Sequence, residues 1–243
     1  VDTGEVGGGL VALFTGFVRR ALAVEIERDN PLLAAGRLLD LRDVRRVVGR
    51  REWKTPWELP EAGILVPALS RLAYRMQASA PSPEASQVRA GHDSVLRMLD
   101  DEHSQDIVRA GAAMGVLDED PVAGEVMYRH QLVQEYFAAR VLADAPNPEL
   151  VRVEWRAAKV RPSVREVIES IDPADSLPPL PTTGWEETTI LASAMAKDPV
   201  GFLRGVTATN PALAARAACQ PELMPRLPED ALDALRWALV TRL

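Results

Sequence analysis

Hydrophobic residues recur every three or four positions along most of this chain, and that spacing is typical of one face of an α-helix. It predicts an amphipathic helix over residues 10–28. A second helix is predicted over residues 32–48, although Gly36 weakens that pattern. A third is predicted over residues 62–77, with Pro67 in the first turn, where a missing N–H matters least.

The middle of the chain combines helix and strand patterns in a specific order. Two short helices are predicted over residues 94–99 and 105–114, with Ser104 as the N-cap of the second. The turn-rich residues 118–124 and the alternating residues 125–129 then predict a small β-hairpin. Because another helical pattern follows, the order is helix, helix, hairpin, helix, which is typical of a winged helix.

His130 stands where the predicted strand meets the next helix. A period of two places it on the same side of the strand as Val126 and Tyr128. In the helix it shares a stripe with Val133 and Phe137, so we expect it at the rim of an apolar face near the helix N-terminus. Taken alone, a histidine in this position is most often a structural side chain that hydrogen-bonds to a neighbour.

The last third of the chain is predicted to be a separate helical unit behind a linker. Prolines crowd residues 146–184, around a short helix expected near residues 164–171. Farther on, Asp198 and Asn210 each precede a proline, which is the pattern of a capping residue followed by the first helical position. Successive helices of this kind favour an α-solenoid of HEAT-like pairs over residues 185–243.

Composition limits the class of protein and its partners. The chain has 243 residues, of which 47% are hydrophobic, enough for a sizeable core. No apolar run reaches the roughly 18 residues that a membrane span needs. The net charge of −7 disfavours a nucleic-acid partner, because neutralising phosphates requires clustered Lys and Arg. The single cysteine, Cys219, excludes an internal disulfide, fits a cytoplasmic location and is interpreted as a small buried hydrophobe.

The sequence lacks the common catalytic and metal-binding motifs. None of its three lysines lies in a G-x-x-x-x-G-K-[ST] pattern, so it has no Walker A loop to cradle phosphates. Residues 96–102 imitate a Walker B strand, but Arg97 interrupts them and a helix explains them better. Four residues can be drawn as a metal cluster: His92, Asp93, Asp101 and His103. Their spacing does not require a metal, and a solvated acidic face is the favoured interpretation. We therefore predict no catalytic residue and no metal site.

The segment around His130 resembles the winged-helix segment of NACHT-type signalling NTPases, a family that includes animal NOD-like receptors and many bacterial proteins. The family pattern is aromatic-x-His followed by Gln-Glu-aromatic-Phe-Ala-Ala, and it is matched here by Tyr128, His130, Gln134, Glu135, Tyr136, Phe137, Ala138 and Ala139. Weaker similarities occur in the family's order at residues 4–6, 13–18, 69–77, 185–188 and 210–216. The family's Walker motifs and its adenine-packing proline are not in this chain.

The resemblance implies a mainly α fold with four parts. Residues 1–60 would end a NACHT helical domain and residues 61–145 would form a winged-helix domain with a small β-hairpin. Residues 146–184 would be a proline-rich linker, and residues 185–243 would begin an α-solenoid of HEAT-like repeats. The first residue is Val1 and the apolar helical pattern continues to the last one, so we expect a portion of a longer protein.

The resemblance also implies a function, which is the sensing of nucleotide by a regulated NTPase. His130 would contact the β-phosphate of ADP held, with Mg²⁺, by an upstream P-loop core that is missing here. Exchange for ATP would release this contact and let the parent protein form a homo-oligomer, in a setting such as bacterial defence. A protein or other trigger would bind the C-terminal repeats. The chain alone, lacking Walker A and B, is not expected to be catalytic.

Two alternatives stay open on the sequence alone. One is a winged-helix regulator that binds DNA through residues 105–114, but Arg109 is the one basic residue there and Asp106 lies beside it. The other is a HEAT-like scaffold that docks protein partners, in which His130 is purely structural.

Overall fold

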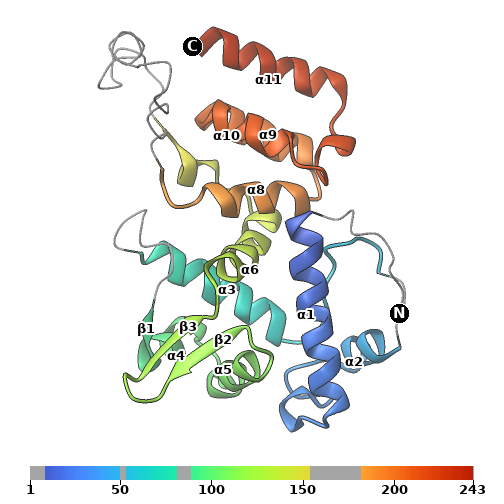
Figure 1. Cartoon of the computed structure of the whole chain (residues 1–243), viewed down its shortest axis with the longest axis vertical. Coiled ribbons are helices and arrows are strands. Elements are labelled where there is room, and N and C mark those ends of the chain that lie inside the picture. The colour runs from blue at the N-terminus through green and yellow to red at the C-terminus, as the bar shows by residue number, and fades with distance from the viewer. Residues whose placement is uncertain (1–8, 50–52, 81–88, 154–181, 243) are drawn as a thin grey trace, which may run out of the picture.

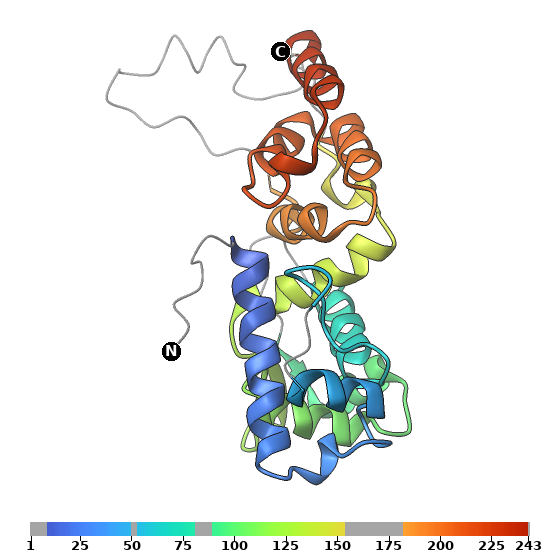
Figure 2. The same cartoon turned by 90° about the vertical axis from the view of Figure 1, so that its right-hand side faces the viewer.

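The computed structural model describes residues 9–49, 53–80, 89–153 and 182–242. Within these ranges the chain is mainly helical and has one small antiparallel sheet of three strands, which confirms the coarse fold class (Figure 1). The sheet and its neighbouring helices lie at one end of the molecule, and a stack of helices lies at the other (Figure 2).

Helix α1 (Leu10–Glu27) confirms the first predicted helix. Its inward face buries Val11, Val18 and Leu22, while Leu13 on the opposite side is 63% exposed. The helix also buries a polar residue, Thr15, because the hydroxyl of that side chain donates to the Val11 carbonyl and is 2.8 Å from the hydroxyl of Tyr136. That second contact joins α1 to helix α6, described below.

The second predicted helix is wrong over its first half. Only a 3-10 turn, η1 (Pro31–Leu33), and the short helix α2 (Leu41–Val48) form between residues 31 and 48. Gly36 has a φ of +87°, a left-handed conformation that interrupts a helix and favours glycine. Asp40 starts α2 by accepting the Arg42 amide at 2.8 Å. The buried apolar residues of this stretch therefore belong to a loop and two short elements, not to one face of a continuous helix.

Three predicted helices of the middle segment are confirmed within a few residues. They are α3 (Leu65–Ala78), α4 (His92–Leu99) and α5 (Ser104–Ala113). The predicted role of Ser104 as an N-cap is wrong, since His103 occupies the cap position of α5 and Ser104 is its first helical residue. The Ser104 hydroxyl instead donates to the Asp101 carbonyl at 2.6 Å, which closes the turn between α4 and α5.

The predicted strand forms the centre of the sheet. β3 (Glu125–Tyr128) pairs with β1 (Ala90–Gly91) on one side and with β2 (Leu117–Asp120) on the other, both antiparallel. Val126 and Tyr128 of β3 are fully buried, in agreement with a period of two. The Tyr128 hydroxyl donates to the Leu69 carbonyl at 2.5 Å, so the sheet is hydrogen-bonded to α3 as well as packed on it.

Helix α6 (Gln131–Asp144) was expected to be amphipathic, but it is buried on all sides over residues 133–139. It packs against α3 on one side and against α8 (Glu186–Met195) on another. Its fully buried Ala138 and Ala139 have small side chains, which let neighbouring helices approach closely. Helix α8 is also buried along most of its length, because it lies between α6 and the helices of the stack (Figure 1).

The helical stack is completed by α9 (Pro199–Thr209), α10 (Pro211–Ala218), the 3-10 turn η3 (Met224–Arg226) and α11 (Glu229–Arg242). Both predicted caps are confirmed: Asp198 accepts the Gly201 amide at 2.9 Å and Asn210 accepts the Leu213 amide at 3.0 Å. Cys219, interpreted as buried, is exposed, because it follows the last turn of α10.

Part of the predicted linker is folded. Residues Pro148–Val151 form the 3-10 turn η2, which packs on α9, and the Asn210 side-chain amide donates to the Val151 carbonyl at 3.2 Å. The predicted short helix over residues 164–171 lies outside the described residues. Among the described helices, none has both the length and the apolar character needed to cross a lipid bilayer.

Candidate functional site

His130 lies between the end of β3 and the start of α6, where it is the N-cap residue of the helix. Its backbone is extended and its ring Nδ1 accepts the Leu132 amide at 3.1 Å. A side chain that accepts a backbone N–H of the first turn satisfies one of the donors that a helix N-terminus leaves unpaired. The position therefore has a clear structural role.

The same hydrogen bond fixes the chemistry of the imidazole. Because Nδ1 must present a lone pair to the Leu132 amide, the proton of the neutral ring is on Nε2. His130 is exposed, so this Nε2–H is a hydrogen-bond donor on the surface of the molecule. The arrangement suits recognition of an acceptor such as a phosphate or carboxylate oxygen.

The strand period placed His130 on the side of Val126 and Tyr128, and the helix pattern placed it at the rim of an apolar face near the helix N-terminus; in the structure it is the N-cap residue of α6. Those two side chains are buried, whereas the histidine is exposed, because β3 ends at Tyr128 and the chain turns before α6 starts. The period of a strand does not continue through that turn. The histidine lies instead at the solvent-facing end of α6, a position compatible with a ligand.

The electrostatic surroundings of His130 favour an anion. The first turn of α6 has no acidic residue, so nothing there offsets the partial positive charge of the helix N-terminus. Arg129 precedes His130 and is exposed. Its guanidinium lies over the turn after α5, since a Cβ built on Gly115 would be 3.2 Å from its Nη1. The nearest carboxylate on the helix is Glu135, which hydrogen-bonds to Gln131 at 2.8 Å.

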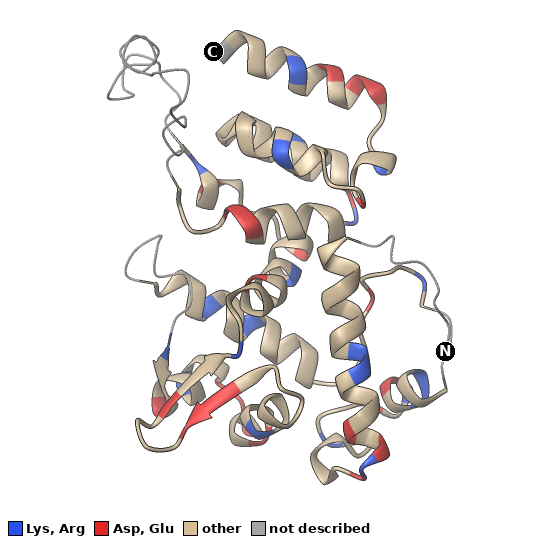
Figure 3. Cartoon of the chain, in the orientation of Figure 1, with Lys and Arg blue, Asp and Glu red and all other residues tan. Residues whose placement is uncertain are grey.

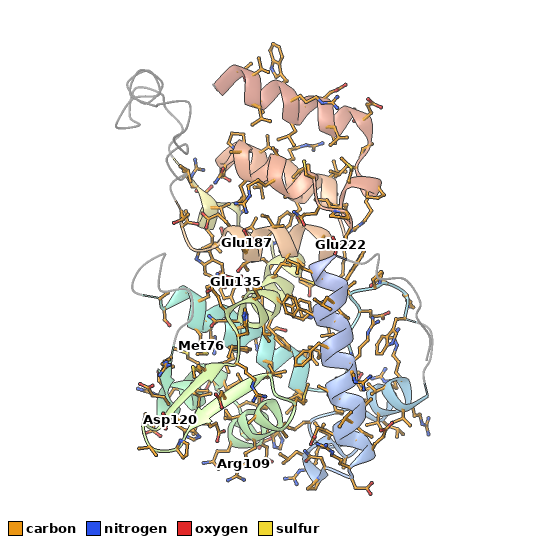
Figure 4. The ribbon with its side chains drawn as sticks, in the orientation of Figure 1. Met76, Arg109, Asp120, Glu135, Glu187 and Glu222 are labelled. Carbon is orange, nitrogen blue, oxygen red and sulfur yellow. The ribbon has the colours of Figure 1, made fainter. Side chains whose placement is uncertain are left out.

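Two polar residues of α6 are buried one turn beyond His130. Gln134 is fully buried and its side-chain oxygen and nitrogen have no hydrogen-bond partner among the described residues. Glu135 is 3% exposed, and its Oε2 is likewise without a partner in the described part of the chain. Figure 4 shows Glu135 on α6 beneath Glu187 on α8. This burial was not expected, because the helix was predicted to have a polar face.

Burial raises the pKa of Glu135 above that of an ordinary glutamate. Removal from water disfavours the charged form, and the carboxylates of Glu187 and Glu186 on α8 act in the same direction. The hydrogen bond from Gln131 lowers the pKa and opposes the larger effect of burial. The α6–α8 boundary therefore contains an acid whose charged form is destabilised by its surroundings.

The acidic residues that imitate a Walker B motif line an open polar cavity of about 640 Å³ between α4 and α5. The apolar part of that motif is helical, with Leu96 in α4, rather than a strand. Asp100, Asp101 and Glu102 lie in the turn that follows. In the described ranges, no group of three or more His, Cys, Asp or Glu side chains is arranged to hold a metal ion.

The β-hairpin has an acidic surface that opposes nucleic-acid binding. Asp118, Glu119 and Asp120 of β2 are exposed, and β2 is an edge strand (Figure 3). Arg109 is the one basic residue of α5. Asp106 of the same helix forms an ion pair with Arg37 at 3.0 Å. A surface of this sign repels the phosphates that supply most of the affinity for DNA.

The described residues thus provide a surface hydrogen-bond donor at a helix N-terminus, supported by a buried helix. This arrangement can bind and orient an anionic group. No family model, no curated protein and no solved structure matches this chain.

Proposed function

We propose that this chain is the regulatory, nucleotide-sensing portion of a NACHT-type signalling NTPase. The proposal is supported first by the element order α3, β1, α4, α5, β2, β3 and by the strand order β1-β3-β2, which are the orders of a winged helix. It is supported also by the stacking of α8, α9, α10 and α11, which agrees with an α-solenoid of HEAT-like pairs.

The single observation that carries the proposal is the geometry of His130. Its Nδ1 caps α6, and its Nε2–H has no hydrogen-bond acceptor among the described residues, so it can donate from an exposed side chain. In the proposed function this donor contacts the β-phosphate of ADP, which is held with Mg²⁺ by an upstream P-loop core. The N-terminus of α6 adds a favourable dipole at the same point.

The proposed mechanism is a two-state switch. With ADP bound, the contact from His130 ties the winged helix to the nucleotide and favours a closed monomer. Exchange for ATP removes the contact and releases the parent protein to form a homo-oligomer in the cytoplasm. A hydrogen bond to a charged group contributes about 1.5–3 kcal/mol, which is enough to shift a two-state equilibrium by roughly tenfold or more.

The test compares two variants in a protein that includes the nucleotide-binding core. His130→Ala removes the cap and the phosphate donor, whereas His130→Ser retains a capping oxygen and removes only the donor. We expect both variants to lose ADP during purification and to oligomerise without a trigger. Nucleotide content measured by chromatography and mass measured by light scattering check this. Wild-type ADP content in His130→Ser would contradict the role of the imidazole.

One observation favours a second candidate, a helical scaffold that docks a protein partner. Trp237 and Val240 lie on α11 with 70% and 73% of their surfaces exposed. Large apolar side chains exposed one turn apart on a helix are typical of an interaction surface. In that case both His130 variants would retain the oligomeric state of the wild type, and Trp237→Ala would impair partner binding.

A further inference from the structure

A cavity of about 430 Å³ lies where the C-terminal end of α6 meets η2, α8 and α9. Its volume is in the range of sites that bind small organic molecules. The walls are mostly apolar and include Leu142, Phe202 and Val206, each of which is at least 94% buried. The cavity is separate from His130, which is at the opposite end of α6, so the inference below does not rest on the proposed function.

One buried polar group lines this cavity without a partner. Thr189 of α8 is 3% exposed and belongs to the cavity wall. Its hydroxyl forms no hydrogen bond with any described residue, and its oxygen is not among the fully enclosed, unpaired side-chain atoms of the described chain. The hydroxyl is therefore available to a ligand that carries a hydrogen-bond donor or acceptor.

The wall formed by α9 lacks a side chain where one would fit. A Cβ built on Gly205 would lie 3.5 Å from the nearest atom of Pro148, an ordinary van der Waals distance. Alanine would therefore fit and would favour the helix, since glycine inside a helix costs roughly 0.5–1 kcal/mol relative to alanine. At Gly201, one turn earlier, an added Cβ would instead overlap the Asp198 carboxylate that caps the helix. The missing side chain at Gly205 keeps the cavity open.

The charged groups at the rim are already paired. Lys197 Nζ is 2.9 Å from the Asp144 carboxylate, and the Asp198 carboxylate accepts the Gly201 amide at 2.9 Å. A charged ligand would have to leave water for apolar walls, and these rim groups, which already have partners, would have to break their contacts to pair with it. The interior thus offers apolar walls and one hydroxyl, which suits an uncharged molecule.

We infer that this cavity is a binding site for a small uncharged molecule with an apolar body and one hydroxyl or carbonyl oxygen. The apolar body lies among Leu142, Phe202 and Val206, and the oxygen hydrogen-bonds to Thr189. Because η2 and α9 both line the cavity and contact each other, the bound molecule stabilises the packing of η2 on the helical stack.

In the test, the whole chain is titrated with 1-hexanol, hexanoate or hexylamine. Binding is measured by calorimetry and by the amide chemical shifts of α8 and α9. We expect 1-hexanol to bind at least tenfold more tightly than either charged probe. Thr189→Val should weaken the binding of 1-hexanol by about five- to tenfold, which is the effect of one neutral hydrogen bond, and should leave the binding of cyclohexane unchanged. Thr207→Val is the matched control, because that hydroxyl bonds to the Leu203 carbonyl and lies outside the cavity wall.

Filling the cavity provides an independent variant. Gly205→Leu should abolish binding of 1-hexanol, and Gly205→Ala, which fits without displacing Pro148, should weaken it while the chain keeps its helical content by circular dichroism. Unchanged affinity in both Gly205 variants would overturn the proposal. So would equal affinity for hexanoate and 1-hexanol, or equal losses in Thr189→Val and Thr207→Val.

Discussion

The side-chain amide of Gln77 and the hydroxyl of Thr188 hydrogen-bond to each other between α3 and α8, with Nε2 2.9 Å from Oγ1. The Thr188 hydroxyl is also 3.0 Å from the Gln77 Oε1, and the same Gln77 amide donates to the Gly184 carbonyl at 2.7 Å. Both side chains are buried and lie 111 positions apart in the sequence. This polar contact joins the sheet-containing end of the molecule to the helical stack.

Replacing one partner of this contact should be costly. In Thr188→Val the Gln77 amide loses a buried partner, and we expect the free energy of unfolding to fall by about 1–3 kcal/mol. Urea denaturation monitored by circular dichroism measures the change. Thr207→Val, which removes a half-buried hydroxyl within one helix, is expected to have a smaller effect.

The double variant Gln77→Leu with Thr188→Val separates the hydrogen bond from the burial of polar groups. Because neither side chain of the pair then lacks its partner, and only the Gly184 carbonyl loses a donor, we expect the double variant to be less destabilised than the sum of its single variants. Simple additivity of the two losses would show that these residues do not interact.

Stability should depend on pH through Glu135. Its pKa is raised in the folded state by burial and by the carboxylates of α8, so the folded chain favours the protonated acid. Below the ordinary glutamate pKa of about 4.3 both states are protonated, and the residue contributes nothing. As the pH rises above that value the unfolded state ionises first, and the wild type loses stability until the folded-state pKa is passed.

The variant Glu135→Gln does not undergo this loss. We therefore expect it to unfold at a higher temperature than the wild type at pH 7, and the difference to vanish near pH 4. Thermal denaturation across this pH range measures the effect, with Glu119→Gln on the exposed edge strand as the control for net charge. A difference independent of pH would contradict a raised pKa at Glu135.

Arg140 should be among the most sensitive positions in the chain. Its guanidinium, on a side chain 10% exposed, donates to the Trp57 carbonyl at 3.0 Å and to the Tyr136 hydroxyl at 3.1 Å, and it pairs with Glu61. Arg140→Met removes all three contacts at once and leaves the Trp57 carbonyl without this donor, and we expect a loss of about 1–3 kcal/mol in the free energy of unfolding.

Arg140→Lys tests whether charge alone is sufficient. A single ammonium group cannot reproduce the planar fork of donors, so lysine should recover only a small part of the lost stability. Full recovery in Arg140→Lys, measured by the same urea titration, would show that geometry is unimportant here.

His130 should contribute modestly to stability in the isolated chain. Loss of the N-cap in His130→Ala is expected to reduce the free energy of unfolding by about 0.5–2 kcal/mol, whereas His130→Ser should be close to the wild type. Stability equal to the wild type in both variants would show that the Nδ1 contact with Leu132 is not stabilising. These values also establish whether both variants are folded before their nucleotide binding is compared.

The sequence by itself determined the local elements. Periodic apolar residues predicted α1, α3 and most later helices, and the capping roles of Asp198 and Asn210 followed from their place before proline. These features depend on neighbours within about one helical turn, which a sequence contains directly. The position of His130 at the start of α6 was predictable for the same reason.

Only the tertiary structure decided the environment of those elements. The burial of Gln134 and Glu135 and the partner of Thr188 each depend on how α3, α6 and α8 meet. The apolar pattern over residues 32–48 also predicted a continuous helix that does not form, because Gly36 has a left-handed conformation that interrupts it. The contacts between α3, α6 and α8 join residues that are far apart in the sequence, so local periodicity cannot predict which side chains they bury. The sequence determined most of the helices and strands, and long-range packing determined which side chains meet solvent, a partner or a cavity.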